Sequence, residues 1–197
     1  MTLPEPCYLE ALKTGTLEKR VRQSLAALKC CVLCPRRCRV DRTRKDRGYC
    51  RTGRWARVAS YNSHFGEEAP LVGQYGSGTI FFSHCNLLCN FCQNYEISHG
   101  GEGRDLSDEQ LAGMMLDLQG AGCHNINFVT PSHVVPQILA AVAIAAQNGL
   151  RVPLVYNSSG YDNAWTLKLL DGIIDIYMPD FKFWDPEVAR ITCDAPD

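Results

Sequence analysis

The stretch Gly78-Thr-Ile-Phe-Phe-Ser-His-Cys85-Asn-Leu-Leu-Cys89-Asn-Phe-Cys92 joins a short apolar run to three closely spaced cysteines. The apolar run follows a glycine and predicts a buried strand, so the cysteines lie on the loop that leaves it. Thiolates are the usual ligands of iron–sulfur clusters, which normally take four of them, so a compact group of three leaves one metal position open. An open position is where chemistry takes place. The stretch therefore predicts a reactive metal centre on Cys85, Cys89 and Cys92, the cysteine triad.

Two other interpretations of the cysteine triad stay open. One is a zinc site completed by a histidine such as His84 or His99, and the other is three unrelated reduced thiols. Packing alone is a poor explanation for three cysteines at the end of a strand, so the cluster is favoured over both.

Beyond the triad, apolar runs and amphipathic stretches alternate along the chain. Residues 125–129, 152–156 and 173–178 predict three further strands, and the stretches between them place apolar residues at helical spacing. Ser107 and Gln110 match a capping box at the start of the first such helix. Alternating strands and helices imply right-handed βαβ units and a parallel sheet, so we predict an α/β fold with about four βα units.

Polar segments follow each of these predicted strands. They are Thr130-Pro-Ser132-His133, Asn157-Ser-Ser-Gly-Tyr161 and Pro179-Asp180-Phe-Lys182. Parallel α/β folds place their active sites at the carboxyl ends of the strands, so these segments and the triad should share one rim. Taken alone, Ser132 can cap a helix and Asn157 can form a turn. Asp180 and Lys182 can likewise form a simple surface ion pair.

A second group of cysteines precedes the triad. Cys31, Cys34 and Cys38 occur in the run Cys31-Val-Leu-Cys-Pro-Arg-Arg-Cys38, and Cys50 follows a glycine and a tyrosine. Four cysteines at this spacing satisfy the needs of a closed tetrahedral zinc site or of an iron–sulfur cluster. Cys30 could replace Cys31 by a shift of one residue, and four free thiols in a basic loop are the alternative to metal binding.

The composition limits the class of protein. The 197-residue chain has a formal net charge of −1, which says nothing about partners. Its 11 cysteines cluster at metal-like spacings, which favours metal ligation in a reducing compartment over a disulfide framework. The N-terminus lacks the features of a signal peptide, and the longest apolar run, residues 138–146, is too short to cross a bilayer. We therefore expect a soluble cytoplasmic protein with no membrane partner.

The N-terminal part of the chain is predicted to form a separate segment. Residues 17–28 predict a helix that caps the domain. Residues 36–57 hold ten of the 20 Lys and Arg residues, but the block has no aromatics at stacking spacing and no zinc-finger histidine pair, which disfavours a nucleic-acid partner. Residues 1–75 are thus predicted to be a helical and Cys-rich metal-binding segment, and residues 76–197 the α/β domain.

The CxxxCxxC spacing of the triad, with Phe91 directly before the last cysteine, resembles the signature of the radical S-adenosylmethionine (SAM) superfamily. The longer run from Gly76 to Asn94 further resembles the branch related to the pyruvate formate-lyase activating enzyme. The resemblance implies that the triad holds a [4Fe-4S] cluster whose fourth iron binds SAM, and that Phe91 lies against the adenine. It also implies a partial parallel (βα) barrel of the radical SAM type after the Cys-rich segment.

The resemblance assigns roles to the rim and shows two departures. Asn157, Asp180 and Lys182 match polar positions that face SAM in the activating enzymes. Residues 130–133 stand where the superfamily usually carries a Gly-Gly-Glu stretch, so a hydroxyl such as that of Ser132, or a backbone carbonyl, would hold the amino group of SAM. The superfamily barrel has six βα units against about four here, so we expect a shortened chain with an exposed apolar last strand that self-associates.

The activity implied by the resemblance is the reductive cleavage of SAM to a 5′-deoxyadenosyl radical by an oxidoreductase of the activating-enzyme type. A glycyl radical enzyme would be its protein substrate, and flavodoxin or ferredoxin its electron donor. A second iron–sulfur cluster or zinc would occupy the earlier cysteine group. Two alternatives stay open: a non-catalytic metal or electron-transfer module, and an inactive shortened radical SAM protein.

Overall fold

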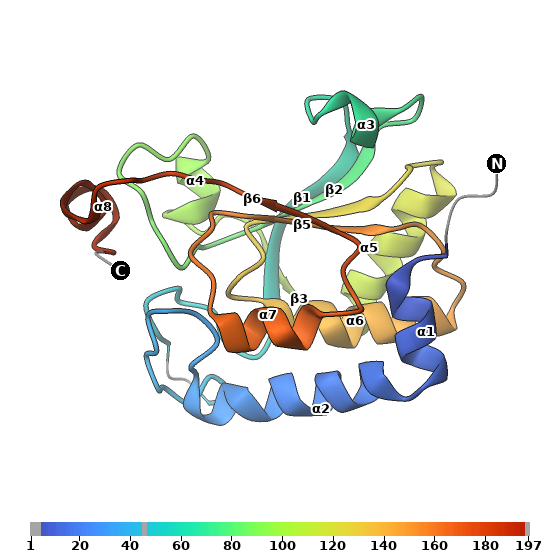
Figure 1. Cartoon of the computed structure of the whole chain (residues 1–197), viewed down its shortest axis with the longest axis horizontal. Coiled ribbons are helices and arrows are strands. Elements are labelled where there is room, and N and C mark those ends of the chain that lie inside the picture. The colour runs from blue at the N-terminus through green and yellow to red at the C-terminus, as the bar shows by residue number, and fades with distance from the viewer. Residues whose placement is uncertain (1–4, 45–46, 196–197) are drawn as a thin grey trace.

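The computed structural model describes residues 5–44 and 47–195, in which one sheet is covered by helices (Figure 1). The strands are β1 (Ala56–His64), β2 (Ser77–Phe82), β3 (Arg104–Leu106), β4 (Ile126–Val129), β5 (Leu154–Ser158) and β6 (Ile176–Pro179). The helices are α1 (Cys7–Lys13), α2 (Thr16–Ala27), α3 (Ala69–Val72), α4 (Tyr95–Ser98), α5 (Asp108–Gly120), α6 (Val135–Gln147), α7 (Ala164–Leu170) and α8 (Pro186–Cys193), with a short 3₁₀ turn at Leu28–Cys30. Lys45 and Asp46 of the predicted basic block lie outside the described residues.

The sheet has the strand order β3-β1-β2-β4-β5-β6. β2, β4, β5 and β6 run parallel to one another and lie side by side in the sheet in the order in which they occur along the chain. This arrangement confirms the predicted α/β fold with a partial parallel barrel. On the other side of β2, β1 pairs with β2 in the antiparallel direction, and β3 pairs antiparallel with β1 at the edge of the sheet. β1 lies before residue 75 and pairs with β2 after it, and the division into two segments stays a prediction.

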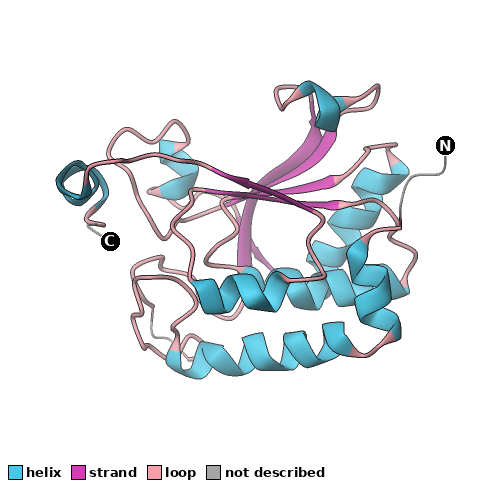
Figure 2. Cartoon of the chain, viewed as in Figure 1, coloured by secondary structure: helices cyan, strands magenta, loops and turns pink. Residues whose placement is uncertain are grey.

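Helices cover one face of the sheet in two layers, an inner layer against the strands and an outer layer against the inner helices. Figure 1 shows α6 and α7 below the strands and α2 below these two helices, and Figure 2 shows the same separation by type of element. α6 is apolar almost all round, and Ile138, Leu139 and Val142 are completely buried. A helix of this kind needs cover on every side, which α5 provides beside it on the sheet and α2 provides on the side away from the sheet. The predicted N-terminal capping helix is therefore confirmed as α2.

The last strand begins later than the sequence predicts. Ile173 and Ile174 are buried, but their N–H groups donate to the carbonyl of Leu170 at 2.9 and 3.1 Å and close a turn after α7. These two isoleucines are therefore apolar because they pack into the core from a turn, and they do not belong to the strand. β6 starts at Ile176 and forms one edge of the sheet, with every second residue partly buried. Within residues 5–44 and 47–195, none of the helices combines the length and the hydropathy needed to cross a bilayer.

Candidate functional site

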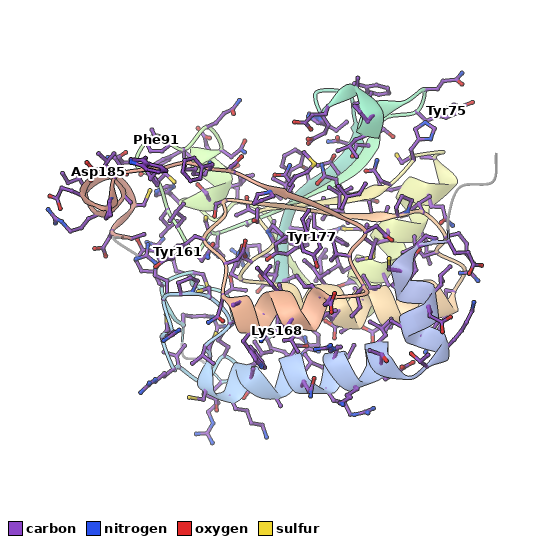
Figure 3. All side chains as sticks on the ribbon, in the orientation of Figure 1. Tyr75, Phe91, Tyr161, Lys168, Tyr177 and Asp185 are labelled. Atoms are coloured by element: carbon purple, nitrogen blue, oxygen red, sulfur yellow. The ribbon has the colours of Figure 1, made fainter. Side chains whose placement is uncertain are left out.

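The carboxyl ends of β2, β4, β5 and β6 meet at one rim, where a cavity of about 620 Å³ opens. Its lining includes these predicted site residues: Cys85, Cys89, Phe91, Cys92, Asn157, Asp180 and Lys182. Figure 3 shows Phe91 and Tyr161 at the same end of the molecule, opposite Tyr75, which precedes β2. The structure therefore brings together the predicted rim residues, except that Ser132 and His133 are buried away from the cavity.

Ser132 does not line this cavity. It is only 2% exposed and lies in the turn between β4 and α6, where the N–H of Val134 donates to the carbonyl of Pro131 at 2.9 Å. Thr130 lines the cavity instead, with a left-handed φ of 59°. The chain reverses directly after β4 and buries Ser132 below the rim, so Thr130, and not Ser132, presents its side chain to the cavity from this turn.

Hydrogen bonds to sulfur shape the loop of the cysteine triad. The N–H of Leu87 donates to Sγ of Cys85 at 3.2 Å, and the hydroxyl of Ser98 donates to Sγ of Cys92 at 3.2 Å. Cys85 and Cys89 are both buried. Donors that point at a sulfur favour its ionised form, which is the form that binds metal.

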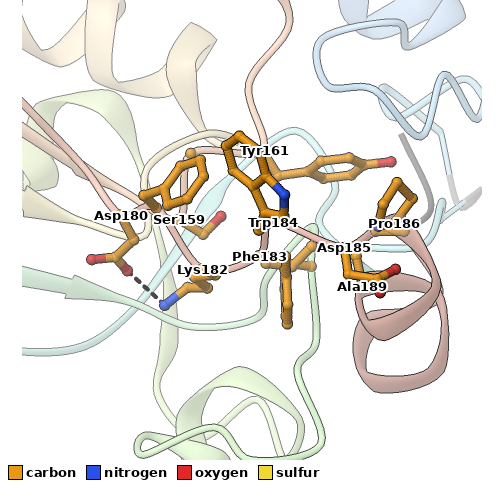
Figure 4. A pocket seen from close by; sticks show the side chains of 13 residues that line it. Ser159, Tyr161, Asp180, Lys182, Phe183, Trp184, Asp185, Pro186 and Ala189 are labelled. Carbon is orange, nitrogen blue, oxygen red and sulfur yellow. Dashed lines mark ion pairs between the residues drawn. The ribbon is translucent and has the colours of Figure 1, made fainter.

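Burial dominates the acid–base properties of these thiols. It raises the pKa of Cys85 and, together with a contact to Cys193, raises the pKa of Cys89 to about 12. Burial alone lowers the pKa of Lys182, but its ion pair with Asp180 at 2.6 Å outweighs this, so the lysine pKa is raised (Figure 4). The lysine charge in turn lowers the pKa of Cys89. Thiols this reluctant to ionise are poor nucleophiles on their own, and Cys85 and Cys89 would lose their protons only when a bound metal displaces them.

The two histidines considered for a zinc site have other contacts. The ring of His99 bonds to Oγ of Ser98 at 2.8 Å and to the carbonyl of Leu88 at 3.3 Å. The ring of His84 packs directly over Gly101. Among the residues that the structure describes, no three Cys, His, Asp or Glu side chains are close enough together to hold a single metal ion. In a [4Fe-4S] cluster each thiolate binds a different iron, so the three sulfurs that line one cavity fit a cluster better than zinc.

Residues 79–197, which carry this rim, match the Radical SAM superfamily. The chain belongs to the radical SAM superfamily. It is also 32% identical over 192 residues to the uncharacterized protein MJ0674 of Methanocaldococcus jannaschii, an alignment that covers 92% of this chain and 54% of that protein. The chain thus spans about half the length of this relative. Radical SAM proteins generally bind a [4Fe-4S] cluster and SAM, which agrees with the cofactors expected from the triad.

In this radical SAM chain, Asp162 organises the end of β5, a role that the sequence does not reveal. Its carboxylate accepts hydrogen bonds from the hydroxyl of Tyr156 at 2.8 Å and from that of Ser158 at 2.6 Å. Gly160, two residues before Asp162, has a φ of 75°, and a Cβ there would collide with the carbonyl of Asp180. The loops after β5 and β6 can therefore approach closely only with glycine at this position.

A smaller hollow of about 370 Å³ adjoins the main cavity. Tyr161, Phe183 and Trp184 line it, and Asp180 and Lys182 belong to both hollows (Figure 4). The Asp180–Lys182 ion pair therefore stands where the two spaces meet. Its neighbour Phe183 also makes an edge contact with Phe91, with 6.0 Å between the ring centroids.

The second cysteine group lies close to the triad. Burial raises the pKa of Cys34 to about 12, and Cys50, Cys31 and Cys38 add to this rise, so the other three thiols of the group lie near Cys34. Cys50 also raises the pKa of Cys85 in the triad. Cys30, in contrast, is exposed, which favours Cys31 as the first member of the group.

Proposed function

We propose that this radical SAM protein holds a [4Fe-4S] cluster on Cys85, Cys89 and Cys92 and cleaves SAM reductively. The observation that carries the proposal is the cavity beside the triad, which is lined by polar side chains from three further strand ends. A module that only transfers electrons has no need for such a cavity, so the catalytic interpretation is better supported than the carrier.

The chemistry that the bound cluster supplies is one-electron reduction of the sulfonium of SAM, which yields methionine and a 5′-deoxyadenosyl radical. The side chains of this chain bind and orient SAM. Lys182 offers a cation to its carboxylate, and Asp180, which is half exposed, offers acceptors to its amino or hydroxyl groups. Phe91 presents a 56% exposed ring on which the adenine can stack, and Asn157 adds an amide from β5.

Electron paramagnetic resonance tests this proposal. The chain is reconstituted with iron and sulfide without oxygen and then reduced with dithionite, and its spectrum is taken with and without SAM. We expect a cluster signal that changes when SAM is added, because SAM occupies the open iron. A signal that SAM leaves unchanged would exclude an open iron at this site.

We further propose that the substrate is a protein, a glycyl radical enzyme, and that flavodoxin or ferredoxin donates the electron in the cytoplasm. The support is the resemblance of Gly76–Asn94 to the activating-enzyme branch, and the many cysteines, which need a reducing compartment. The test adds a candidate glycyl radical enzyme, SAM and reduced flavodoxin, and looks for a glycyl radical signal. A signal that appears without the cysteine triad, or no signal with any candidate, would refute this assignment.

We also propose that Cys31, Cys34, Cys38 and Cys50 bind a second metal centre. Arg42 supports this, because it is only 1% exposed and its Nη1 donates to Sγ of Cys31 at 3.6 Å. No carboxylate in the described part of the chain forms an ion pair with Arg42, and a buried cation without a counter-charge is costly. Metal-bound thiolates would supply that negative charge.

Metal analysis of a chain in which Cys85, Cys89 and Cys92 are all alanine tests the second centre. We expect about one zinc ion or one iron–sulfur cluster per chain to remain, and this metal should not cleave SAM. A single zinc ion would require the four thiols to move closer together, because no three Cys, His, Asp or Glu side chains of the described residues are placed to hold one ion. Iron with acid-labile sulfide would identify a cluster, and zinc alone would identify a tetrahedral site. A folded variant without metal would remove the proposal.

A further inference from the structure

Arg36 connects the Cys-rich segment to the loop of the cysteine triad. Its Nε donates to the carbonyl of Asn86 at 2.9 Å, and its Nη2 donates to the carbonyl of Leu87 at 3.3 Å. The same Nη2 donates to the carbonyl of Cys193 at 2.6 Å, and Nη1 donates to the carbonyl of Asp194. One guanidinium thus joins the N-terminal segment, the triad loop and the end of α8. A planar fork can reach these four carbonyls at once, whereas the single ammonium of lysine cannot.

Two tyrosines hold the guanidinium in place. Its central carbon lies 3.7 Å from the centroid of the Tyr49 ring and 5.3 Å from that of Tyr161. The hydroxyl of Tyr49 also donates to the carbonyl of Cys193 at 3.3 Å, so the ring has its own anchor on the same segment. Aromatic faces attract a cation, and the attraction grows as water is excluded. The contacts therefore fix the position of the charge as well as the backbone it binds.

The charge of Arg36 has almost no neutralising partner in the protein. The side chain is 10% exposed, and its ion pair is with Asp194, at 4.0 Å and with 80% of the aspartate side chain exposed. An ion pair this long and this exposed does little to neutralise the charge of Arg36 or to stabilise the fold. In the part of the chain that the structure describes, no other carboxylate pairs with Arg36. The other acceptors are the carbonyls of Asn86 and Leu87, which immediately follow Cys85 in the triad loop, and those of Cys193 and Asp194. The unbalanced positive charge therefore lies against the backbone of the loop whose thiolates would carry negative charge once they bind metal.

We propose that Arg36 is a positioning residue that fixes the triad loop and raises the reduction potential of the cluster bound there. This inference rests on the proposed function, because it needs a cluster on Cys85, Cys89 and Cys92. Reduction adds a negative charge to a cluster, and a nearby buried cation stabilises the reduced form, which makes the potential less negative. The sequence hides this role, because the triad loop lies 50 residues further along the chain.

The test compares Arg36→Gln and Arg36→Lys with Arg37→Gln in the full chain after anaerobic reconstitution. Arg37 is exposed, so its change removes the same formal charge without touching the loop. The measurements are the midpoint potential of the SAM-responsive cluster signal and the rate at which a chelator removes its iron. We expect Arg36→Gln to shift the potential to a more negative value and to speed iron loss about tenfold. Arg36→Lys keeps the charge but loses the fork, so we expect faster iron loss with a smaller shift in potential.

The outcomes separate this inference from the proposed function. If both Arg36 variants match Arg37→Gln in potential and in iron loss, Arg36 has no role at the cluster, and the proposed function stands. If the unchanged chain forms no SAM-responsive cluster, the proposed function and this inference both fall. Circular dichroism checks that Arg36→Gln folds. If it does not fold, the rate of iron loss from the smaller change Arg36→Lys tests whether Arg36 fixes the triad loop.

Discussion

Burial gives the polar side chains near the rim properties that the same residues lack in water. It raises the pKa of Cys85, Cys89 and Cys34 and lowers that of His133 to about 3, so each of these groups is uncharged at neutral pH without a metal. The thiols can become charged when they bind a cation, whereas His133 is completely enclosed by the protein and stays neutral. The same physical cause therefore keeps these cysteines protonated until a metal displaces the proton, and keeps the histidine neutral.

Removing single thiols should show which of them hold the cluster. We expect Cys85→Ala, Cys89→Ala or Cys92→Ala to abolish the SAM-responsive cluster, because each removes one of the three ligands. The matched control is Cys123→Ala, since Cys123 is equally buried but lies near Ser63 and Tyr75, away from the triad. Iron and sulfide content with the electron paramagnetic resonance signal is the measurement. A dispensable Cys89, or a required Cys123, would show that the ligands are assigned wrongly.

His133 should make the chain less stable in acid. Burial and, next, the charge of Arg42 lower its pKa to about 3, with a smaller effect from His84, while the ring bonds to the carbonyl of Ser83 at 3.0 Å. An unfolded histidine titrates near about 6.5, so between about pH 6.5 and 3 the unfolded state binds one more proton and stability falls as the pH falls. We expect this group alone to lower the free energy of unfolding by about 2 kcal/mol from pH 7 to pH 5.

Urea denaturation at the two pH values measures this loss. The control is His133→Gln, whose amide can still donate to the carbonyl of Ser83 but does not titrate. The difference between pH 7 and pH 5 should be smaller in the variant by the same amount. An identical pH dependence in both chains would mean that His133 is not held neutral in the folded state.

At the scale of elements, the sequence predicts the rim well because parallel strands deliver their carboxyl ends to one edge. Strand periodicity was enough to place Asn157, Asp180 and Lys182 beside the triad. Strand periodicity did not place Ser132 correctly. Thr130, directly after β4, has a left-handed backbone that turns the chain and leaves the Ser132 side chain buried. The hydrophobic pattern of a sequence does not predict a backbone turn of this kind. Strand periodicity also failed for the start of β6, since burial in a turn and burial in a strand look alike in sequence.

The start of α5 offers a test of the local signals. Oγ of Ser107 accepts the N–H of Gln110 at 3.2 Å, and the Gln110 side chain accepts the N–H of Ser107 at 2.9 Å, which confirms the predicted capping box. We expect Ser107→Ala to lower the free energy of unfolding by about 1 kcal/mol, because the first turn loses an acceptor. Ser107→Thr keeps the hydroxyl and should cost much less. Equal stability of all three chains in urea would contradict this role.

At the scale of the whole molecule, the N-terminal segment, the rim and α8 depend on contacts that only the folded chain reveals. Arg36 lies within the second cysteine group and 50 residues before Asn86 of the triad loop, yet the two segments meet in the folded chain. The spacing of the cysteines within each group predicted a metal site, whereas the contact between the two groups could be seen only in the folded structure. Exposed aromatic side chains lie on β6 and directly after it: Tyr177 is 42% exposed, Phe181 80% and Trp184 90%.

The exposed edge at β6 should make the chain self-associate. An unpaired strand edge with apolar neighbours favours pairing with another chain. We expect sedimentation velocity to show a concentration-dependent increase in size, and expect Tyr177→Lys combined with Trp184→Ser to reduce it. Phe65→Ser removes a comparably exposed ring far from β6 in the sheet order and serves as the control. A chain that stays monomeric at the highest concentrations would contradict the expectation.

The most direct test of the account is the amount of 5′-deoxyadenosine formed from SAM by the reconstituted chain under dithionite. We predict that the unchanged chain and Cys123→Ala form it, even if slowly and without a coupled substrate, and that Cys89→Ala forms none. Failure of the fully loaded chain to form 5′-deoxyadenosine, or equal formation by Cys89→Ala, would contradict the assignment of SAM cleavage to the cysteine triad.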